Sequence, residues 1–345
     1  MAARMAAKQG LAGNGMRLVN VFIALTLSCA ATSLASAAGT DPSEHDHPPD
    51  EVEPQGDHDH AAHPPHGSLG NVGAKLANPV SDMWSIQFNV QGPTFNDGDL
   101  NLGNPELGGN VLFQPVMPIP LYGSGEDTWR LIVRPILPIV FAQPVPTCQT
   151  LGCNQFETKG GLGDWDWQLL LTAPSSFTKL PKELIVGAGA TVVFPTATSD
   201  ALGSEQFAMG PSLVLGWKTP KFTAVTLTSY NFHVGDRNDR KITTPDTSSM
   251  SLLYALIFNL PDAWQVGMNP TITYDNQASS GNKWNVPVGL FAAKTIKIGN
   301  TPLNLRAGLE YSVVSQDTFG KRAILRFQIT PVIPSLIQKS IFGGG

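Results

Sequence analysis

Ten residues near the C-terminal end alternate between apolar side chains and polar or small ones: Leu303-Asn304-Leu305-Arg306-Ala307-Gly308-Leu309-Glu310-Tyr311-Ser312. Successive side chains of a β-strand point to opposite faces, so a period of two predicts a strand with one apolar face and one polar face. The polar face carries two charges in its middle, Arg306 and Glu310. Such a strand suits a wall between an apolar surrounding and a polar interior.

The same period recurs along the chain. It is clear at 84–91, 129–137, 165–171 and 322–329. Further strand-like runs lie near 107–119, 184–194, 206–218, 222–233, 249–259, 264–274 and 284–296. This makes about twelve strands, and single-chain bacterial outer-membrane barrels have an even number. We therefore expect an all-β fold, a transmembrane antiparallel β-barrel of about twelve strands.

The connections between these strands alternate in length. Short turn signals lie at 123–125, 219–221, 260–262 and 299–302, and longer polar stretches at 92–106, 143–163, 195–205, 234–248, 275–283 and 315–321. Long-short alternation is typical of outer-membrane hairpins. Five prolines fall inside expected strands, where each removes a ladder hydrogen bond, and we expect bulges to absorb some of them. They are Pro115, Pro118, Pro135, Pro138 and Pro211.

Composition supports the barrel over other classes. Charged residues are 14% of the 345 residues, against about 25% in soluble domains. After residue 40 no apolar run reaches the roughly 20 residues of a membrane-spanning helix. Residues 71–345 hold 19 acidic and 19 basic side chains, and this balance gives no electrostatic footprint for nucleic acid. A soluble all-β protein with few charges is the alternative.

The N-terminus predicts export. Arg17 precedes a mostly apolar stretch, 18–30, and Ala35-Ser36-Ala37 supplies the small residues of a cleavage site. We assign 1–37 to a secretory signal peptide cleaved after Ala37. Of the cysteines that remain, Cys148 and Cys153 form an even pair in an exported chain, which favours a disulfide over a metal site.

Residues 38–77 form the next expected segment, an acidic, His-rich and disordered periplasmic extension. Its first part, 38–70, holds eight Asp or Glu residues and no Lys or Arg. It has too few large apolar residues to bury a core. Its six histidines could bind Zn²⁺, Cu²⁺ or Ni²⁺, and the alternative is a solvated linker. They are His45, His47, His58, His60, His63 and His66.

Eight charged residues are expected to point into the lumen, because a charge facing lipid at mid-depth costs about 2–4 kcal/mol. They are Arg130, Arg134, Asp164, Asp166, Arg306, Glu310, Arg322 and Arg326. They either line an open pore that selects solutes or form a salt-bridged network that fills a narrow barrel. Both alternatives stay open at this point.

No catalytic site is expected in the barrel. His233 is the one histidine of the expected barrel, and a serine hydrolase needs a Ser that a His can activate. Outer-membrane phospholipases place that Ser two residues after the His, where this chain has Gly235. The run Gly160-Gly161-Leu162-Gly163 lacks the Lys-Ser/Thr ending of a phosphate loop. We read it as a turn into a strand.

A family resemblance rests on several motifs. They are Asn96-Asp97-Gly98, Leu107-Gly108-Gly109-Asn110-Val111-Leu112-Phe113-Gln114-Pro115, Gly161-Leu162-Gly163-Asp164, Phe194-Pro195-Thr196-Ala197-Thr198, Ala278-Ser279-Ser280-Gly281-Asn282-Lys283-Trp284 and Val286-Pro287-Val288-Gly289. Together they resemble the proteobacterial outer-membrane barrels labelled neuromedin U or transporter. These are similar to outer-membrane proteins of the MetA pathway of phenol degradation. The resemblance spans roughly 78–333 and implies a barrel that passes small organic compounds.

These readings combine into one expectation: a barrel at 78–335 with a C-terminal tail at 336–345, in the outer membrane of a Gram-negative bacterium. It is a passive channel or transporter for small solutes, aromatic or hydrophobic ones included. The alternative is a closed structural or binding barrel with a metal-binding periplasmic tail. Expected partners are outer-membrane lipid, a small-molecule solute and the barrel-assembly machinery, with no nucleic acid. No cofactor is expected apart from Zn, Cu or Ni on the tail.

Calorimetric titration of Zn²⁺ into a peptide of residues 38–70 tests the metal hypothesis. Neutral imidazoles are good ligands for Zn²⁺, so we expect saturable binding that disappears when the six histidines are replaced by Asn. Absence of any binding heat in the unsubstituted peptide would leave the segment as a solvated linker.

Overall fold

The computed structural model describes residues 69–77, 81–148, 150, 152, 154–237, 245–337 and 339–343. The chain divides into two units, 1–65 and 66–345, and the second contains the β-sheet. The expected signal peptide, the six histidines of the extension and Cys153 lie outside the described residues.

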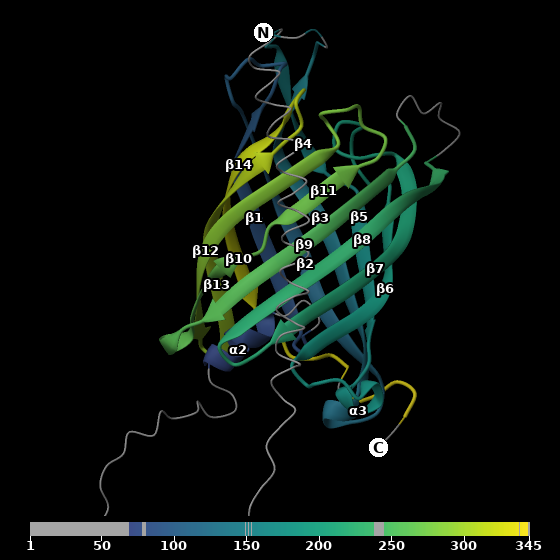
Figure 1. Cartoon of the computed structure of the whole chain (residues 1–345), viewed down its shortest axis with the longest axis vertical. Helices are drawn as coiled ribbons and strands as arrows, with labels where there is room; N and C mark the ends of the chain where they lie inside the picture. The colour runs from purple at the N-terminus through teal and green to yellow at the C-terminus, as the bar shows by residue number, and fades with distance from the viewer. Residues whose placement is uncertain are drawn as a thin grey trace, which may run out of the picture. The chain divides into compact units, whose positions relative to one another are not determined.

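Fourteen β-segments make up the sheet (Figure 1). They are β1 (Ser85–Asp97), β2 (Glu106–Tyr122), β3 (Trp129–Pro146), β4 (Phe156–Leu162), β5 (Trp165–Thr172), β6 (Leu184–Phe194), β7 (Gln206–Lys218), β8 (Phe222–Asp236), β9 (Ser248–Asn259), β10 (Trp264–Met268), β11 (Thr271–Asp275), β12 (Trp284–Ile298), β13 (Thr301–Val314) and β14 (Gly320–Pro331). β4 and β5 pair in succession with β3, and β10 and β11 with β9. Each of these two pairs continues one strand, which leaves twelve strands.

The sheet closes on itself. Every neighbouring pair is antiparallel, and β1 pairs with β14 through partners such as Phe88↔Ile329 and Val90↔Phe327. The expected antiparallel barrel of about twelve strands is confirmed. Closure gives the edge strands partners, which a sheet in lipid requires because no water is available there.

The two faces of the wall differ in chemistry, as the alternation predicts. Large apolar side chains stand exposed on the outer face, among them Leu290 at 71%, Leu309 at 51% and Phe327 at 50% exposed. The side chains between them on the same strands point inward, and many are polar and buried, such as Asn304, Glu310 and Gln328. An exposed apolar belt of this extent on a closed barrel is a surface for lipid.

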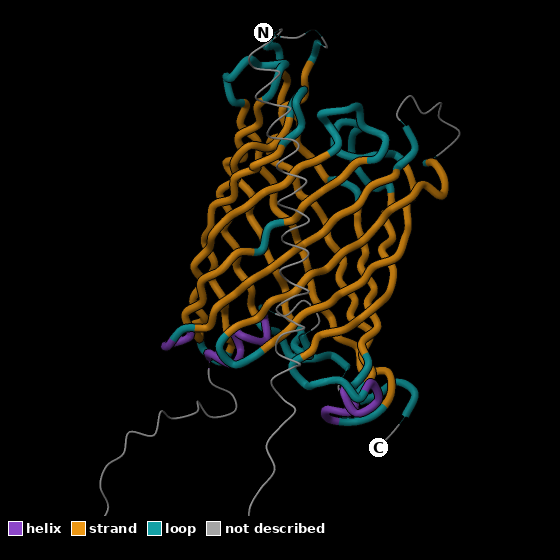
Figure 2. Tube along the Cα trace, in the orientation of Figure 1, coloured by secondary structure: helices purple, strands orange, loops and turns teal. Residues whose placement is uncertain are grey.

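The two ends of the barrel differ in their connections. Four short helical elements lie with the short turns: α2 (Leu69–Leu76), η1 (Gly125–Asp127), α3 (Ser175–Thr178) and η2 (Pro261–Ala263). Figure 1 shows α2 and α3 at this end, and Figure 2 shows the longer loops at the other. With an even number of strands, both the start and the end of the barrel lie at the short-turn end. None of the helices in the described ranges is long and apolar enough to cross a membrane.

Several local expectations need correction. Residues 69–76 form helix α2, so the expected disorder is wrong for this part of the extension. The expected loop 143–163 is too long, because β3 continues to Pro146 and β4 begins at Phe156. Gly160, Gly161 and Leu162 therefore belong to a strand.

Pro115 and Pro135 are accommodated without a bulge at their own positions. The ladder between β2 and β3 passes from Phe113↔Leu137 to Met117↔Val133 in the same register, and it skips the neighbourhood of Pro115 and Pro135. The bulges of this ladder lie elsewhere, next to Gly109 and Pro120. Two prolines on facing strands thus cost local hydrogen bonds but leave the register unchanged.

Because the two faces of the wall meet different surroundings, a lysine should destabilise the barrel more on the outer face than on the inner face. Leu309→Lys places a charge toward lipid near the middle of β13 and should reduce the free energy of unfolding by about 2–4 kcal/mol. Gln87→Lys, which points into the lumen, is the control and should change it by less than about 1 kcal/mol. Urea unfolding in lipid vesicles measures both, and equal losses would contradict the assignment of faces.

Candidate functional site

The interior of the barrel encloses a cavity of about 330 Å³. Its lining comes from nine segments of the wall, on both sides of the barrel, and from the end of α2. The lining residues are Leu76, Ala77, Gln87, Asn89, Gln91, Leu112, Gln114, Arg134, Ile136, Asp166, Gln168, Val225, Leu227, Ser251, Leu253, Ala255, Ile257, Asn269, Thr271, Arg306, Arg326 and Gln328. This volume is at the lower end of the range for small-molecule sites, about 300–1,000 Å³.

One wall of the cavity is polar. β1, β2 and β14 contribute amide side chains, and β3 contributes Arg134, which is 6% exposed. Arg134 Nη1 donates a hydrogen bond to Gln168 Oε1 at 3.1 Å. Asp166 lies beside them on β5, and its Oδ1 accepts a hydrogen bond from Thr191 Oγ1 at 2.8 Å.

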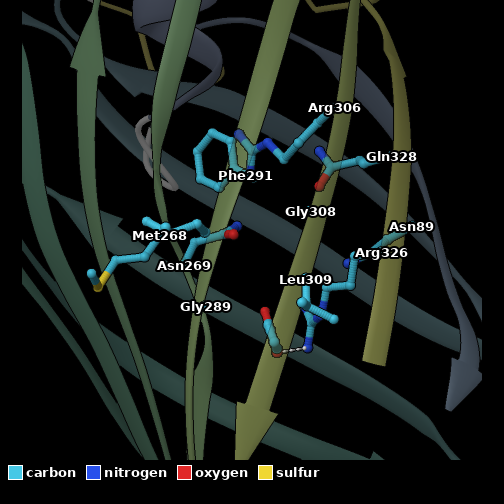
Figure 3. Close-up of a pocket in the computed structure, with 12 residues that line it drawn as sticks. Asn89, Met268, Asn269, Gly289, Phe291, Arg306, Gly308, Leu309, Arg326 and Gln328 are labelled. Atoms are coloured by element: carbon cyan, nitrogen blue, oxygen red, sulfur yellow. Dashed lines mark ion pairs between the residues drawn. The ribbon is translucent and has the colours of Figure 1, made fainter. Parts of the chain in front are cut away.

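Two arginines on neighbouring strands continue this polar wall (Figure 3). Arg326 Nη2 on β14 lies 2.9 Å from Glu310 Oε2 on β13. Arg306 Cζ lies 4.0 Å from the centroid of the Phe291 ring, so its guanidinium stacks on that ring. A cation at the centre of a membrane-spanning segment costs about 2.5–3.5 kcal/mol on insertion scales, which makes such residues functional candidates.

The opposite wall is apolar. β8 and β9 turn Val225, Leu227, Leu253, Ala255 and Ile257 toward the lumen. Four of them belong to a buried apolar cluster that also contains Ala77, directly after α2, and Leu253 packs against this cluster. The lumen is therefore amphipathic across its width, with amides and arginines facing aliphatic side chains.

Helix α2 closes the cavity toward the short-turn end. A Cβ atom on Gly73 would lie 2.7 Å from Thr295 Oγ1, so this glycine lets the helix approach β12 closely. Thr295 is buried and accepts a hydrogen bond from Asn304 Nδ2 at 3.0 Å. The helix thus rests on a fixed polar network at the mouth of the barrel.

The strand pairing of the barrel wall is interrupted beside Arg306. β12 pairs with β10 as far as Phe291 and with β11 only from Asn285, so residues 286–290 face the break between β10 and β11. Figure 2 shows this break as a short loop within the wall. Tyr254 bridges it from β9, and its hydroxyl donates to the carbonyl of Pro287 at 2.6 Å. A cavity of about 20 Å³ here touches both lumen residues and the lipid-facing Leu290.

The eight charged residues expected in the lumen fall into two groups. Arg134, Asp166, Arg306 and Arg326 line the cavity, and Glu310 binds Arg326 beside it. The remaining three, Arg130, Asp164 and Arg322, are absent from the cavity lining.

Arg130 sits at the short-turn end and donates to the carbonyls of Gly125 and Thr128. Asp164 accepts hydrogen bonds from Ala197 N and from the backbone and hydroxyl of Ser204, so it anchors the 195–205 loop. Arg322 is half-buried on β14 and is absent from the cavity lining.

The amides and the apolar wall were missed as site residues. Gln87, Asn89 and Gln91 were visible as the polar phase of the first strand. The run 252–258 is almost continuously apolar on both faces, and this loss of alternation was the signal for an apolar lumen wall.

Neither His233 nor Cys148 belongs to the cavity lining. His233 Nε2 lies 2.9 Å from Asp236 Oδ1, near the end of β8. Cys148 is disulfide-bonded, and its expected partner Cys153 lies outside the described residues. Within the described ranges no group of three His, Cys, Asp or Glu side chains is placed to hold a metal ion.

Comparison with known proteins supports the fold. No protein-family model matches the sequence, and no curated protein matches it. The structure is similar to the COG4313 outer membrane channel from Pseudomonas putida F1, with a TM-score of 0.51 and 13% identity over 72% of this chain and 94% of that chain.

Two further structures are more distant. The NanC porin has a TM-score of 0.41 and 8% identity over 73% of this chain and 99% of that chain. The Pseudomonas putida toluene transporter TodX has a TM-score of 0.37 and 12% identity over 75% of this chain and 91% of that chain. Both of these similarities are weak. The similarity to the COG4313 channel shows that this chain shares the fold of an outer-membrane channel.

Proposed function

We propose that this chain is a passive outer-membrane channel for small solutes, aromatic or hydrophobic ones included. The observation that carries the proposal is the lumen: a cavity of about 330 Å³ lies inside a closed barrel, and one of its walls is polar while the other is apolar. A barrel built as a mere anchor would gain stability from side chains that fill this space. A cavity with convergent polar groups is instead the usual form of a small-molecule site.

The surroundings of the barrel follow from the same proposal. The exposed apolar belt suits outer-membrane lipid, and the N-terminal signal sequence suits export in a Gram-negative bacterium and insertion by the barrel-assembly machinery. The sequence motifs favour the neuromedin U or MetA-pathway type of barrel. The proposal assigns the barrel no catalytic chemistry.

The alternative is a closed barrel whose His-rich extension captures metal in the periplasm. One observation favours it: α2 occupies the short-turn mouth, where its end and Ala77 line the cavity. The same helix also suits a channel that opens when α2 moves. The two functions therefore differ in whether current flows when the helix is removed.

Single-channel recording in planar bilayers separates them. The refolded mature chain is compared with a chain lacking 38–68, which keeps α2, and with a chain lacking 38–77. We expect the loss of 38–77 to raise the conductance several-fold, because it removes the floor of the cavity, while the loss of 38–68 leaves it nearly unchanged. Silence of all three chains would contradict the channel and leave the closed barrel.

A single substitution tests the contact between α2 and β12. Gly73→Val should displace α2 from Thr295, because even a Cβ atom comes too close to the hydroxyl there. We expect a conductance between those of the mature chain and of the chain lacking 38–77. A Thr295→Ala substitution combined with Gly73→Val should restore part of the closure, and no change in either variant would show that this contact does not hold the helix.

A further inference from the structure

Of the two neighbouring arginines Arg306 and Arg326, only Arg326 is paired with a carboxylate. They lie on adjacent strands, where Arg306 pairs in register with Gln328 and Gly308 with Arg326. Glu310 forms its ion pair with Arg326. Among the described residues no ion pair joins Arg306 to a carboxylate, and its Nε has no hydrogen-bond partner. Lys321 also interacts electrostatically with Arg326 and Glu310, so the positive charges of this cluster outnumber its single carboxylate.

A third arginine, Arg134, lies elsewhere on the polar wall. Arg134 binds the neutral amide of Gln168, and its Nε has no hydrogen-bond partner within the described part of the chain. Asp166, the nearby carboxylate, interacts electrostatically with Arg134 but makes its hydrogen bond with Thr191. The cavity lining carries three arginines and one aspartate, and Glu310 lies beside it, so arginines outnumber carboxylates by one where lipid surrounds the barrel.

The guanidinium of Arg306 lies against the Phe291 ring (Figure 3). A planar guanidinium presents paired N–H donors that match the two oxygens of a carboxylate. Buried charges in proteins are stable when they are paired. The missing partner of this group is therefore a carboxylate that the protein itself does not supply.

The wall opposite the arginines selects the rest of the ligand. Val225, Leu253 and Ile257 present aliphatic surface to the same cavity, which an apolar or aromatic body would cover with release of water. A small inorganic anion would leave this surface wet. The two walls together fit a molecule with a charged end and an apolar body.

We propose that the lumen binds small amphipathic monocarboxylates, with the carboxylate at Arg306 or Arg134 and the apolar body on the β8–β9 wall. This inference rests on the proposed channel function and names its substrate class. The positive charge attracts the anion into the lumen, and the apolar wall retains molecules with an aromatic or short aliphatic body. Neutral analogues lack the first interaction, and acetate lacks the second.

Calorimetry on the mature chain in lipid nanodiscs tests the proposal, with empty nanodiscs as the baseline. The probes are 4-phenylbutyrate, its neutral amide and acetate. We expect 4-phenylbutyrate to bind at least ten-fold more tightly than either of the other two. Equal binding of the acid and the amide, or no binding of the acid, would overturn the proposal.

Variants locate the site. Arg306→Gln should weaken binding of 4-phenylbutyrate about ten-fold, Arg306→Lys should weaken it less, and Leu253→Ser should weaken it without affecting acetate. Lys159→Gln is the matched control, because Lys159 pairs with Glu157 in exposed positions on β4 and its charge lies outside the cavity lining. Full affinity in both Arg306→Gln and Arg134→Gln would overturn the proposal. If a variant fails to fold, as heat-modifiable gel migration reports, the comparison of acid and amide on the unsubstituted chain decides.

Different experimental results would contradict the channel function and the anion-binding site. A barrel that binds the acid but never conducts would contradict the channel and keep the anion site. A barrel that conducts but shows no preference for the acid over the amide would keep the channel and contradict the anion site.

Discussion

In a lipid bilayer every backbone N–H and C=O group must find its partner within the protein, and the pairing of β1 with β14 meets this requirement for the whole sheet. Without that ladder, two edge strands would face hydrocarbon unpaired. Closure also separates an inside from an outside, so that one phase of each alternating strand meets lipid and the other meets the lumen. The polar residues of the interior depend on this separation.

The same requirement explains where irregular backbone occurs. Residues 286–290 of β12 pair with β13 but have no register partner on the side of β10 and β11. Pro287 in this stretch has no N–H to satisfy. The hydroxyl of Tyr254 supplies a donor to the carbonyl of Pro287. Arg306 and Arg326 lie just inside this interruption of the strand pairing. Met268 and Asn269 border the same small cavity as these two arginines (Figure 3).

The sequence predicted the architecture because alternation is a local signal. In β13, Arg306 and Glu310 alternate with Leu305 and Leu309, and this alternation already assigns the inner and the outer face of the wall. The break between β10 and β11 was not predicted, since Pro270 resembles the other prolines that the strands accommodate. Helix α2 was missed because it packs against distant parts of the chain, such as Thr295 beside Gly73, and such contacts are not visible in the local sequence.

The candidate site was predictable in part for the same reason. A charge on the polar phase of a strand must point inward, which placed Arg134, Asp166, Arg306 and Arg326 at the lumen. Alternation predicts which face a side chain is on, but it does not predict how far along the barrel axis the residue lies. Arg130 and Asp164 were therefore expected in the lining, and they instead bind a turn and a loop. The apolar wall needed the pairing of β8 with β9, which brings Val225 and Leu253 to one side of the lumen.

The assignment of inner and outer faces is tested most directly by spin labels on β1 in lipid vesicles. Single cysteines at Gln87, Phe88, Val90 and Gln91 carry the label, and its collisions with oxygen and with a water-soluble nickel chelate are measured by electron paramagnetic resonance. We predict that labels at Phe88 and Val90 collide mainly with oxygen, which concentrates in lipid, and that labels at Gln87 and Gln91 collide mainly with the chelate. Equal access of the chelate to all four positions would contradict a membrane barrel with a polar lumen.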